Sequence, residues 1–390
     1  APYGPPYGPP YGPYAPPYGA PPYGAPYAPP YAAPSRPYPG VPRAGRMKVL
    51  MLSFAHPTAS NGVSAVLYHL MPALTSLGVE VELLTKWYGE PFFFYPAGSS
   101  SMQQFNTIDE FLATRSTNEY SFIHAHAVTF TEQINPPDPT TYWDKLFGYF
   151  KVPSAYTVHF LNRYNLLTGK WRKYQYEARK WVGDVLEPYI LDRVNAIIQL
   201  NKSFVQITDE IYPGKDYSTK TVIIPNGVDL SSVTLKTKPR SPEINLLYLG
   251  RLDRNKGIYE LCDAFSELYK KYPNLKLHIV GEGAPRGNYT DFEAETINRI
   301  LRRTKIPPDK FIIYGPKYEK EKEDIINNSD FVIIPSYSEI FCMVALEAIS
   351  HKKSLIASTV PGLKETFIDT GLAYSIDFGE LRYNEPSDSQ

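Results

Sequence analysis

The stretch INLLYLGRLDRNKGIYELCDAFSELYKKYPNLKLHIV, residues 244–280, decides the class of fold. It begins with an apolar run at 244–249 and ends with another at 275–280, and each has the length of a buried strand. Between them, residues 259–271 have the spacing of an amphipathic helix that begins after Gly257. A strand, a helix and a second strand in this order predict a parallel, doubly wound sheet.

The same order of elements occurs earlier in the chain. A strand is expected at 48–53, a helix at about 64–77 and a second strand at 80–85. A polar segment at 231–242 reads as a linker between two such α/β domains. Because ligands of doubly wound sheets bind beyond the carboxyl ends of the strands, we expect the site in the cleft between the domains. Further short apolar runs predict the remaining strands, at 121–124, 154–159, 196–200, 311–314 and 331–334.

We expect four regions along the chain: a tail at 1–46, α/β domains at 47–235 and 243–379, and a polar tail at 380–390. The first region is a low-complexity repeat of Pro, Tyr, Gly and Ala. It cannot bury a core, and we expect it to be disordered and extended. Its regular tyrosines would make weak multivalent contacts, or the tail is an inert extension.

The bulk composition excludes several classes of function. The chain has 40 basic and 40 acidic residues, and a formal net charge of zero gives no argument for nucleic-acid binding. Its two cysteines, Cys262 and Cys342, do not make a disulfide framework. No apolar run approaches the roughly 18–20 residues of a membrane span, and the sequence has no signal-peptide pattern. We therefore expect a cytoplasmic protein.

Two glutamates eight residues apart form the most informative motif. Residues 336–348, SYSEIFCMVALEA, follow the predicted strand at 331–334 and contain Glu339 and Glu347. The two serines before Glu339 read as helix caps, and the apolar run from Phe341 reads as a buried helix. Eight helical residues span roughly 12 Å, which is about the distance from the sugar ring to the ribose of a nucleotide sugar. A helix start between the carboxylates would direct its N–H groups at the diphosphate.

Two cations follow the strand at 244–249. Arg251 and Lys256 lie between Gly250 and Gly257, in the turn that leads into the next helix. Arginine can grip two phosphate oxygens with its planar fork, and lysine supplies a point charge. The chain has no Asp-x-Asp motif near a strand that would hold a sugar, so we expect these cations, and no metal or other cofactor, to stabilise a diphosphate.

Together these motifs resemble glycosyltransferase family 4, the retaining enzymes with the GT-B fold. The resemblance covers about 47–376, and each motif is specific only as part of the ordered set. It implies that a nucleoside diphosphate sugar is the donor and that its sugar is transferred with retention. It also implies that Glu339 holds the sugar, that Glu347 holds the ribose, and that Arg251 and Lys256 hold the diphosphate.

The resemblance assigns further positions. His159 ends the predicted strand at 154–159 and would lie beside the sugar, although Phe160 stands where an aspartate commonly follows. His124 and His126 also end a strand and share one face; a metal pair, acceptor-side lining and a structural role all remain open. The remaining positions expected to contact the donor are Asn61, Gly62, Gly250, Gly281, Gly283, Ile340, Phe341 and Cys342.

The chain also departs from the family pattern. Ile340 and Cys342 stand where the family usually has glycines, which predicts a sugar pocket that is narrowed, altered or inactive. Asn61 replaces the first of two usual glycines, but asparagine tolerates a left-handed backbone, so we expect that turn to be kept. The family normally continues through more helix, including one that crosses back onto the N-terminal domain, so we expect either that the domain at 243–379 is shortened or that the protein closes its cleft differently.

The acceptor stays open, as a glycan, a lipid-linked molecule or a small molecule. Residues 170–181 are basic and aromatic with helical spacing, and predict either peripheral membrane contact or an ordinary helix. Two other functions are compatible with the sequence. One is a nucleotide-sugar epimerase of the same fold, and the other is a catalytically silent scaffold that assembles through its tail.

Overall fold

The computed structural model describes residues 47–54, 62–86, 91–99, 101–126, 140–168, 180–238, 241–283, 297–298, 301 and 306–376. Several predicted features lie outside these residues. They are the tails at 1–46 and 380–390, Asn61, and most of the basic and aromatic segment at 170–181.

The N-terminal domain contains an eight-stranded sheet with the order β4-β3-β2-β1-β5-β6-β7-β8. Its strands are β1 (Lys48–Ser53), β2 (Glu80–Lys86), β3 (Phe92–Tyr95), β4 (Gln103–Phe105), β5 (Phe122–His126), β6 (Ser154–Thr157), β7 (Ala196–Gln199) and β8 (Thr221–Ile223). Its helices are α1 (Gly62–Ser76), α2 (Ile108–Ala113), α3 (Thr140–Phe150), α4 (Asn162–Thr168), α6 (Glu187–Arg193) and α7 (Lys202–Ile211), with a π-helical turn, η1, at Val182–Leu186.

The C-terminal domain contains a six-stranded sheet with the order β11-β10-β9-β12-β13-β14, and all of its described strand pairs are parallel. Its strands are β9 (Ile244–Leu249), β10 (Leu275–Val280), β11 (Phe311–Ile313), β12 (Phe331–Ile334), β13 (Ser354–Ser358) and β14 (Ala373–Ile376). Its helices include α8 (Ile258–Lys271), α10 (Glu319–Asn328), α11 (Met343–Ser350) and α12 (Pro361–Leu363), and a π-helical turn, η6, follows at Lys364–Ile368.

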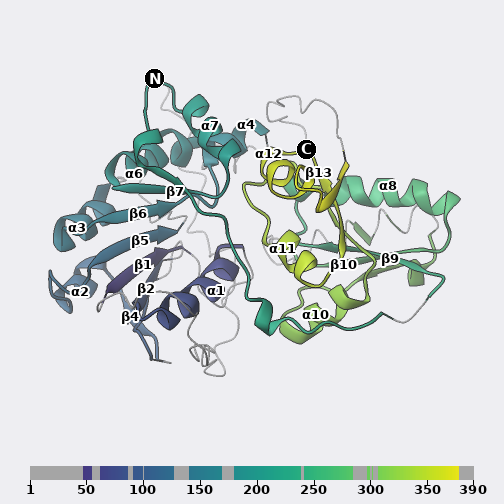
Figure 1. The fold of residues 1–390 in the computed structure, drawn as a ribbon, viewed down its shortest axis with the longest axis horizontal. Coiled ribbons are helices and arrows are strands. Elements are labelled where there is room, and N and C mark those ends of the chain that lie inside the picture. Colours follow the sequence, from purple (N-terminus) through teal and green to yellow (C-terminus); the bar gives the residue numbers. More distant parts are fainter. Residues whose placement is uncertain are drawn as a thin grey trace, which may run out of the picture.

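The two domains lie side by side, with the N-terminal one drawn in purple to teal and the C-terminal one in green to yellow (Figure 1). Helices α1 and α11 lie against each other across the domain boundary. The prediction of two α/β domains is confirmed. At one edge of the N-terminal sheet the strands are not parallel, because β3 pairs antiparallel with both β2 and β4.

Burial on both faces explains why β1 and β9 are central strands. In β1, Met51 packs towards α1 while Leu50 and Leu52 pack into the core on the other face of the sheet. In β9, Tyr248 packs on the α8 side while Leu247 belongs to the core beneath α11. Continuous apolar strands of this kind are typical of parallel sheets that are covered by helices on both faces.

The order of the C-terminal strands fixes where a ligand site can form. The chain proceeds outward from β9 through β10 to β11, then crosses to β12 on the opposite side. The connection after β9 runs towards β10, and the connection after β12 runs the other way, towards β13. The gap between the carboxyl ends of β9 and β12 is therefore the switch point of the sheet. The two loops that carried the sequence motifs begin at these two ends.

The middle of the predicted linker is attached to α10 and to the residues that follow it. Asn327 donates to the carbonyl of Thr234 at 2.8 Å and accepts from the backbone N–H of Lys236 at 3.3 Å. The side chain of Lys236 also forms an ion pair with Asp324, and that of Lys238 pairs with Asp330. Residues 234–238 are therefore held by the C-terminal domain.

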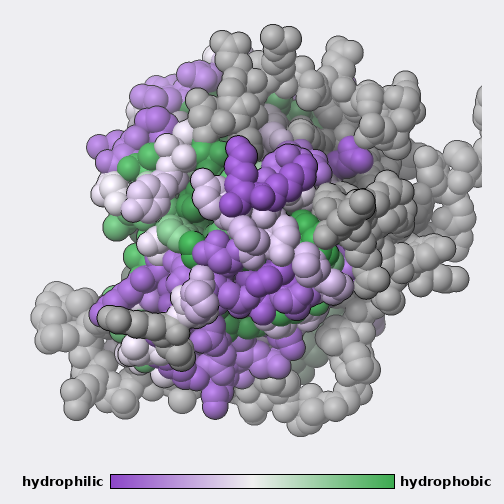
Figure 2. All heavy atoms as spheres, turned by 90° about the vertical axis from the view of Figure 1, so that its right-hand side faces the viewer, coloured by the Kyte–Doolittle hydropathy of each residue, from purple (hydrophilic) through white to green (hydrophobic). Residues whose placement is uncertain are grey.

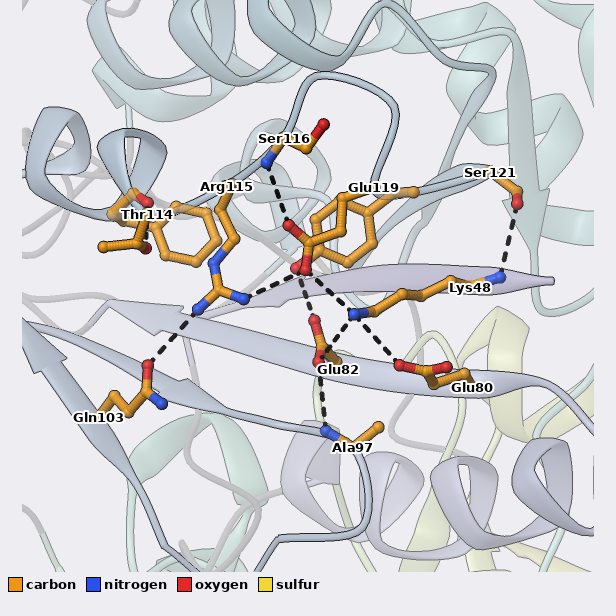
Figure 3. A network of polar contacts seen from close by, with 12 residues as sticks. Lys48, Glu80, Glu82, Ala97, Gln103, Thr114, Arg115, Ser116, Glu119 and Ser121 are labelled. Carbon is orange, nitrogen blue, oxygen red and sulfur yellow. Dashed lines mark hydrogen bonds and ion pairs between the residues drawn. The ribbon is translucent and has the colours of Figure 1, made fainter. Parts of the chain in front are cut away.

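A network of charged side chains lies at the amino ends of the strands in the N-terminal sheet, beside the start of β1 (Figure 3). The ammonium of Lys48 lies 3.1 Å from Glu80, 3.1 Å from Glu82 and 3.0 Å from Glu119. Glu82 is buried and also accepts a hydrogen bond from the Tyr120 hydroxyl at 2.7 Å. Ligands of such sheets bind beyond the carboxyl ends of the strands, so this network lies at the end of the sheet away from the expected ligand site.

The outer side of the C-terminal domain has a mixed surface in which hydrophilic residues prevail and hydrophobic ones form small groups (Figure 2). Within the described ranges, no helix combines the length and the apolar character needed to cross a bilayer.

Candidate functional site

The loops beyond β9 and β12 pack directly against each other. The backbone N–H of Tyr337 donates to the carbonyl of Asn255 at 2.8 Å. Gly257 has a φ of 65°, and a Cβ at this position would lie 1.9 Å from the carbonyl oxygen of Pro335. Only glycine fits here, because residues with a Cβ disfavour this left-handed backbone conformation and because the Pro335 carbonyl leaves no space for a Cβ. The close approach brings the two motifs to one place.

The β9 loop is organised by Asp253. Its carboxylate accepts from the backbone N–H groups of Asn255 at 2.9 Å and Lys256 at 3.2 Å, as a helix cap does. It also lies 3.1 Å from the guanidinium of Arg251, whose side chain is 53% exposed. The buried Tyr248 hydroxyl donates to the Arg251 carbonyl at 2.5 Å. The loop thus presents Arg251 outward and turns Lys256 inward.

Lys256 and Glu339 form an ion pair inside the site. The ammonium of Lys256 donates to Glu339 Oε1 at 2.6 Å, and the Ser336 hydroxyl donates to the same oxygen at 2.9 Å. The Glu339 side chain is only 11% exposed. Burial alone would lower the pKa of Lys256, but the adjacent carboxylate outweighs it, and the pKa is raised. The lysine is therefore charged at neutral pH.

The helix begins later than the sequence predicted. Helix α11 starts at Met343, with Cys342 as its N-cap residue, so Glu339 lies in the preceding loop. The serines before Glu339 are not helix caps, because Ser336 donates to Glu339 and Ser338 donates to Asn165. The expected helical span of roughly 12 Å therefore does not apply. The apolar run from Phe341 was predicted to be helical throughout, but its first two residues belong to a buried loop. Apolar residues in a buried loop have no periodic pattern that would distinguish them from a buried helix.

Glu347 lies on α11 and faces two other elements. Lys322 on α10 donates to Glu347 Oε1 at 3.1 Å. His69 on α1 is close enough that Glu347 acts on its pKa: burial lowers that pKa and Glu347 partly offsets the effect. The sequence interpretation missed both His69 and Lys322. No local pattern indicated them, because their proximity to Glu347 arises from the packing of three separate helices.

The side chains of the three residues after Glu339 pack into hydrophobic cores. Ile340 is 3% exposed and packs into the core of the N-terminal domain. Phe341 packs edge-on against Phe367 with ring centroids 5.9 Å apart. Cys342 is buried; burial first, and Glu339 second, raise the pKa of its thiol to about 12. Donor contacts from the backbone of this segment stay a prediction.

One of the predicted glycines, Gly281, is required by close packing. A Cβ on Gly281, whose φ is 140°, would lie 1.9 Å from the carbonyl oxygen of Gly250. The loops beyond β9 and β10 therefore run side by side, and Gly283 is buried in the second of them. Gly62 is the first residue of α1, and a Cβ added there would have nothing within 4 Å, so packing does not demand glycine at this position.

Three histidines form a chain at the ends of β5 and β6. His126 and His159 share a hydrogen bond of 3.0 Å, and the rings of His124 and His126 lie 4.0 Å apart. His124 also hydrogen-bonds the Thr157 hydroxyl at 2.7 Å. β5 extends to His126, whereas β6 ends at Thr157, so His159 lies just beyond its strand.

These histidines are held neutral. Burial lowers the pKa of His124 to about 4 and that of His159 to about 3, and it lowers the pKa of His126 well below its usual value. In the part of the chain that the structure describes, no group of three or more His, Cys, Asp and Glu side chains is arranged to hold a metal ion. Neutral imidazoles can each donate one hydrogen bond and accept another.

Comparison with known proteins identifies the class. Residues 235–380 match the family model described as glycosyl transferases group 1. A glycogen synthase of Mycobacterium tuberculosis is 24% identical over 358 residues, which cover 83% of this chain and 80% of the relative. A sucrose-phosphate synthase from Thermosynechococcus elongatus has a similar structure, with a TM-score of 0.66, 20% identity and coverage of 86% and 87%. The Anabaena protein HepE, solved with UDP and glucose, gives a TM-score of 0.57 at 15% identity, with coverage of 87% and 88%.

The fold and the matched family define a GT-B-type glycosyltransferase. The match to the model of the group 1 glycosyl transferases lies in the C-terminal domain. The resemblance drawn from the two glutamates and the cationic loop is thereby confirmed for the class of protein.

Proposed function

We propose that the protein transfers a sugar from a nucleoside diphosphate sugar to an acceptor hydroxyl, with retention at the anomeric carbon. The single observation that carries this proposal is the Lys256–Glu339 pair, 2.6 Å apart, beyond the carboxyl ends of β9 and β12. A cation and a carboxylate in contact offer one group for a phosphate and another for sugar hydroxyls. A doubly wound sheet binds its ligands at this switch point.

In the proposed reaction, the bond between the anomeric carbon and the phosphate oxygen breaks, and its electron pair passes to the diphosphate. The acceptor oxygen forms the new bond on the same face, and its proton goes to the leaving phosphate oxygen. Arg251 and Lys256 would stabilise the charge that grows on the diphosphate, which is commonly the largest electrostatic contribution to such a step. We propose that these two cations, rather than a metal ion, serve this purpose.

The carboxylates and the histidine would orient the donor. Glu339 would accept hydrogen bonds from sugar hydroxyls, and Glu347 would accept them from the ribose. His159 would contribute a neutral imidazole from the N-terminal domain, since burial holds its pKa at about 3. The presence of UDP and glucose in the structure of HepE, which shares the fold, supports a nucleotide sugar as the donor.

Calorimetric titration with a panel of nucleoside diphosphates tests the proposal first, because it identifies the base without knowledge of the acceptor. The matching nucleotide sugar then serves in a transfer assay. We expect Arg251→Ala and Glu339→Gln to lose at least about a hundredfold in kcat, as for removal of one transition-state contact. Glu347→Gln should chiefly weaken binding of the nucleoside diphosphate.

Glu267→Gln provides the matched control, since this glutamate lies on α8 in the same domain and its side chain is 73% exposed. It should keep full activity. Full activity in Arg251→Ala or in Glu339→Gln would overturn the assignment, and so would failure of every nucleoside diphosphate to bind.

A further inference from the structure

The residues on both sides of Glu339 are hydrogen-bonded by the N-terminal domain. The Ser338 hydroxyl donates to Asn165 Oδ1 on α4. The carbonyl of Ile340 accepts from Asn201 Nδ2 at 2.7 Å, in a buried position. Glu339 itself contacts Lys256 of the C-terminal domain. The sugar-binding carboxylate proposed above therefore lies on a loop whose two flanks are held from across the domain boundary.

Two hydrogen bonds fix the orientation of the Asn201 side-chain amide. Its Oδ1 accepts from the backbone N–H of Phe204 at 3.0 Å, which caps α7. Because Oδ1 is committed to that N–H, the group that faces Ile340 must be the NH₂, which donates. Asn201 is only 4% exposed. One buried side chain thus joins the start of a helix in one domain to the Glu339 loop of the other.

The same end of α7 makes a second contact with the C-terminal domain. The carboxylate of Glu365, in the π-helical turn η6, accepts from the backbone N–H groups of Lys202 at 2.8 Å and Ser203 at 2.6 Å. It also accepts from the Ser203 hydroxyl at 2.6 Å. A carboxylate at a helix N-terminus is a favourable arrangement, because it satisfies free N–H groups and the helix dipole.

The Glu339 loop is also backed by its own domain. A Cβ on Gly362 would lie 2.4 Å from the carbonyl oxygen of Glu339 and 2.2 Å from that of Ile340. Helix α12 therefore presses against the loop from behind, while the Ile340 side chain enters the N-terminal core in front. If the domains separated, the loop would lose Asn165, Asn201 and the apolar contact of Ile340 at once.

We infer that Asn201 is a positioning residue that makes the placement of Glu339 depend on contact between the two domains. This inference rests on the proposed function, in which Glu339 handles the sugar. The carboxylate reaches its working position only when the interface has formed. Such coupling protects an activated donor, because the site is incomplete while water still has access.

Two substitutions at Asn201 separate this role from helix capping. Asp and Ser cap helices about as well as Asn, so Asn201→Asp and Asn201→Ser keep the acceptor for Phe204. Asn201→Asp places a carboxylate oxygen against the Ile340 carbonyl, and Asn201→Ser is too short to reach it. Thr107, which caps α2 through the N–H of Glu110, supplies the control Thr107→Asp.

Hydrogen exchange measured on peptides of the whole protein tests the inference without any substrate. We expect residues 336–346 to exchange about tenfold faster in both Asn201 variants, as for loss of one hydrogen bond. The strand at 48–53 should be unchanged in the same samples. Wild-type exchange at 336–346 in both variants would overturn the inference.

The transfer assay gives an independent measurement. In both Asn201 variants kcat should fall about tenfold while the KM for the donor stays within about twofold, because nucleotide contacts through Glu347 are untouched. Thr107→Asp should match the wild type in both constants. Unchanged kcat in both Asn201 variants would contradict the inference. A wild-type protein without transfer activity would instead refute the proposed function, and the exchange experiment would still decide whether Asn201 holds the loop.

Discussion

The ammonium of Lys256 lies 2.6 Å from Glu339 Oε1, although 83 residues separate the two in the chain. The pair joins the loops that follow two strands on either side of the switch point. In the absence of a donor, each charge neutralises the other and so limits the cost of burying them. A donor would then replace part of this contact with its phosphate and its sugar hydroxyls.

Removal of either partner is expected to destabilise the fold. We predict that Lys256→Met and Glu339→Gln each lower the free energy of unfolding by about 2 kcal/mol, below the roughly 3–5 kcal/mol of a fully buried pair because both side chains keep some exposure. The double variant should lose clearly less than the two single losses combined, because no unpaired charge remains. Urea denaturation measures all three, and additive losses would show that the pair is not coupled.

Gly257→Ala is predicted to be strongly destabilising. The left-handed backbone costs roughly 1–2 kcal/mol for a residue with a Cβ, and the 1.9 Å contact with the Pro335 carbonyl adds to it. Thermal unfolding should show a fall of several degrees. Gly148→Ala in α3 is the control, since its Cβ would have nothing within 4 Å. That variant should be neutral or stabilised by about 0.5–1 kcal/mol, and equal effects at both positions would contradict the argument.

Lys48→Met should reduce stability without affecting transfer. It leaves the buried Glu82 without its cation, which we expect to cost about 2–4 kcal/mol. Activity per folded molecule should stay at the wild-type level, because the network lies at the amino ends of the strands. Lys270→Met removes an exposed ion pair with Glu267 and should cost less than about 1 kcal/mol. A loss of the same size in both variants would show that burial of the network is unimportant.

Stability should fall as the pH drops below about 6.5, the ordinary pKa of histidine. Burial lowers the pKa of His124 to about 4 and that of His159 to about 3, so the unfolded chain binds protons that the folded chain excludes. Their stabilising contribution is complete above about pH 6.5 and is lost as the pH falls towards about 4, at roughly 1 kcal/mol per pH unit for each imidazole. Urea denaturation between about pH 7.5 and 5.5 measures the slope. His124→Gln should reduce it, and a flat profile in the wild type would refute the prediction.

The sequence was most informative where a local pattern decides the structure. The apolar runs at 48–53 and 244–249 predicted their strands to the residue, because strands buried on both faces have no polar alternation to obscure them. The cationic turn was correctly placed after the strand at 244–249, and Glu339 was correctly placed after the strand at 331–334. Their meeting at Lys256 and Glu339 follows from the order of the parallel strands.

Tertiary packing accounts for what the sequence did not indicate. Ile340 read as an obstruction in a sugar pocket, yet its side chain fills the core of the other domain. The hydrogen bond between His126 and His159 joins two strands that are adjacent only in the folded sheet. Likewise, β3 was not predicted because a short, largely buried strand, Phe92–Tyr95, has no period that sets its direction.

The attachment of residues 234–238 to α10 has a practical consequence for dividing the protein into fragments. A C-terminal fragment that starts at 243 would lack Thr234, Lys236 and Lys238, which contact Asn327, Asp324 and Asp330. An expression boundary before Thr234 keeps these contacts and leaves a free N-terminal half whose last strand is β8. The segment between β8 and this attachment is then 224–233, which is where a cleavage site or a pair of fluorescent labels would report on movement of the two halves.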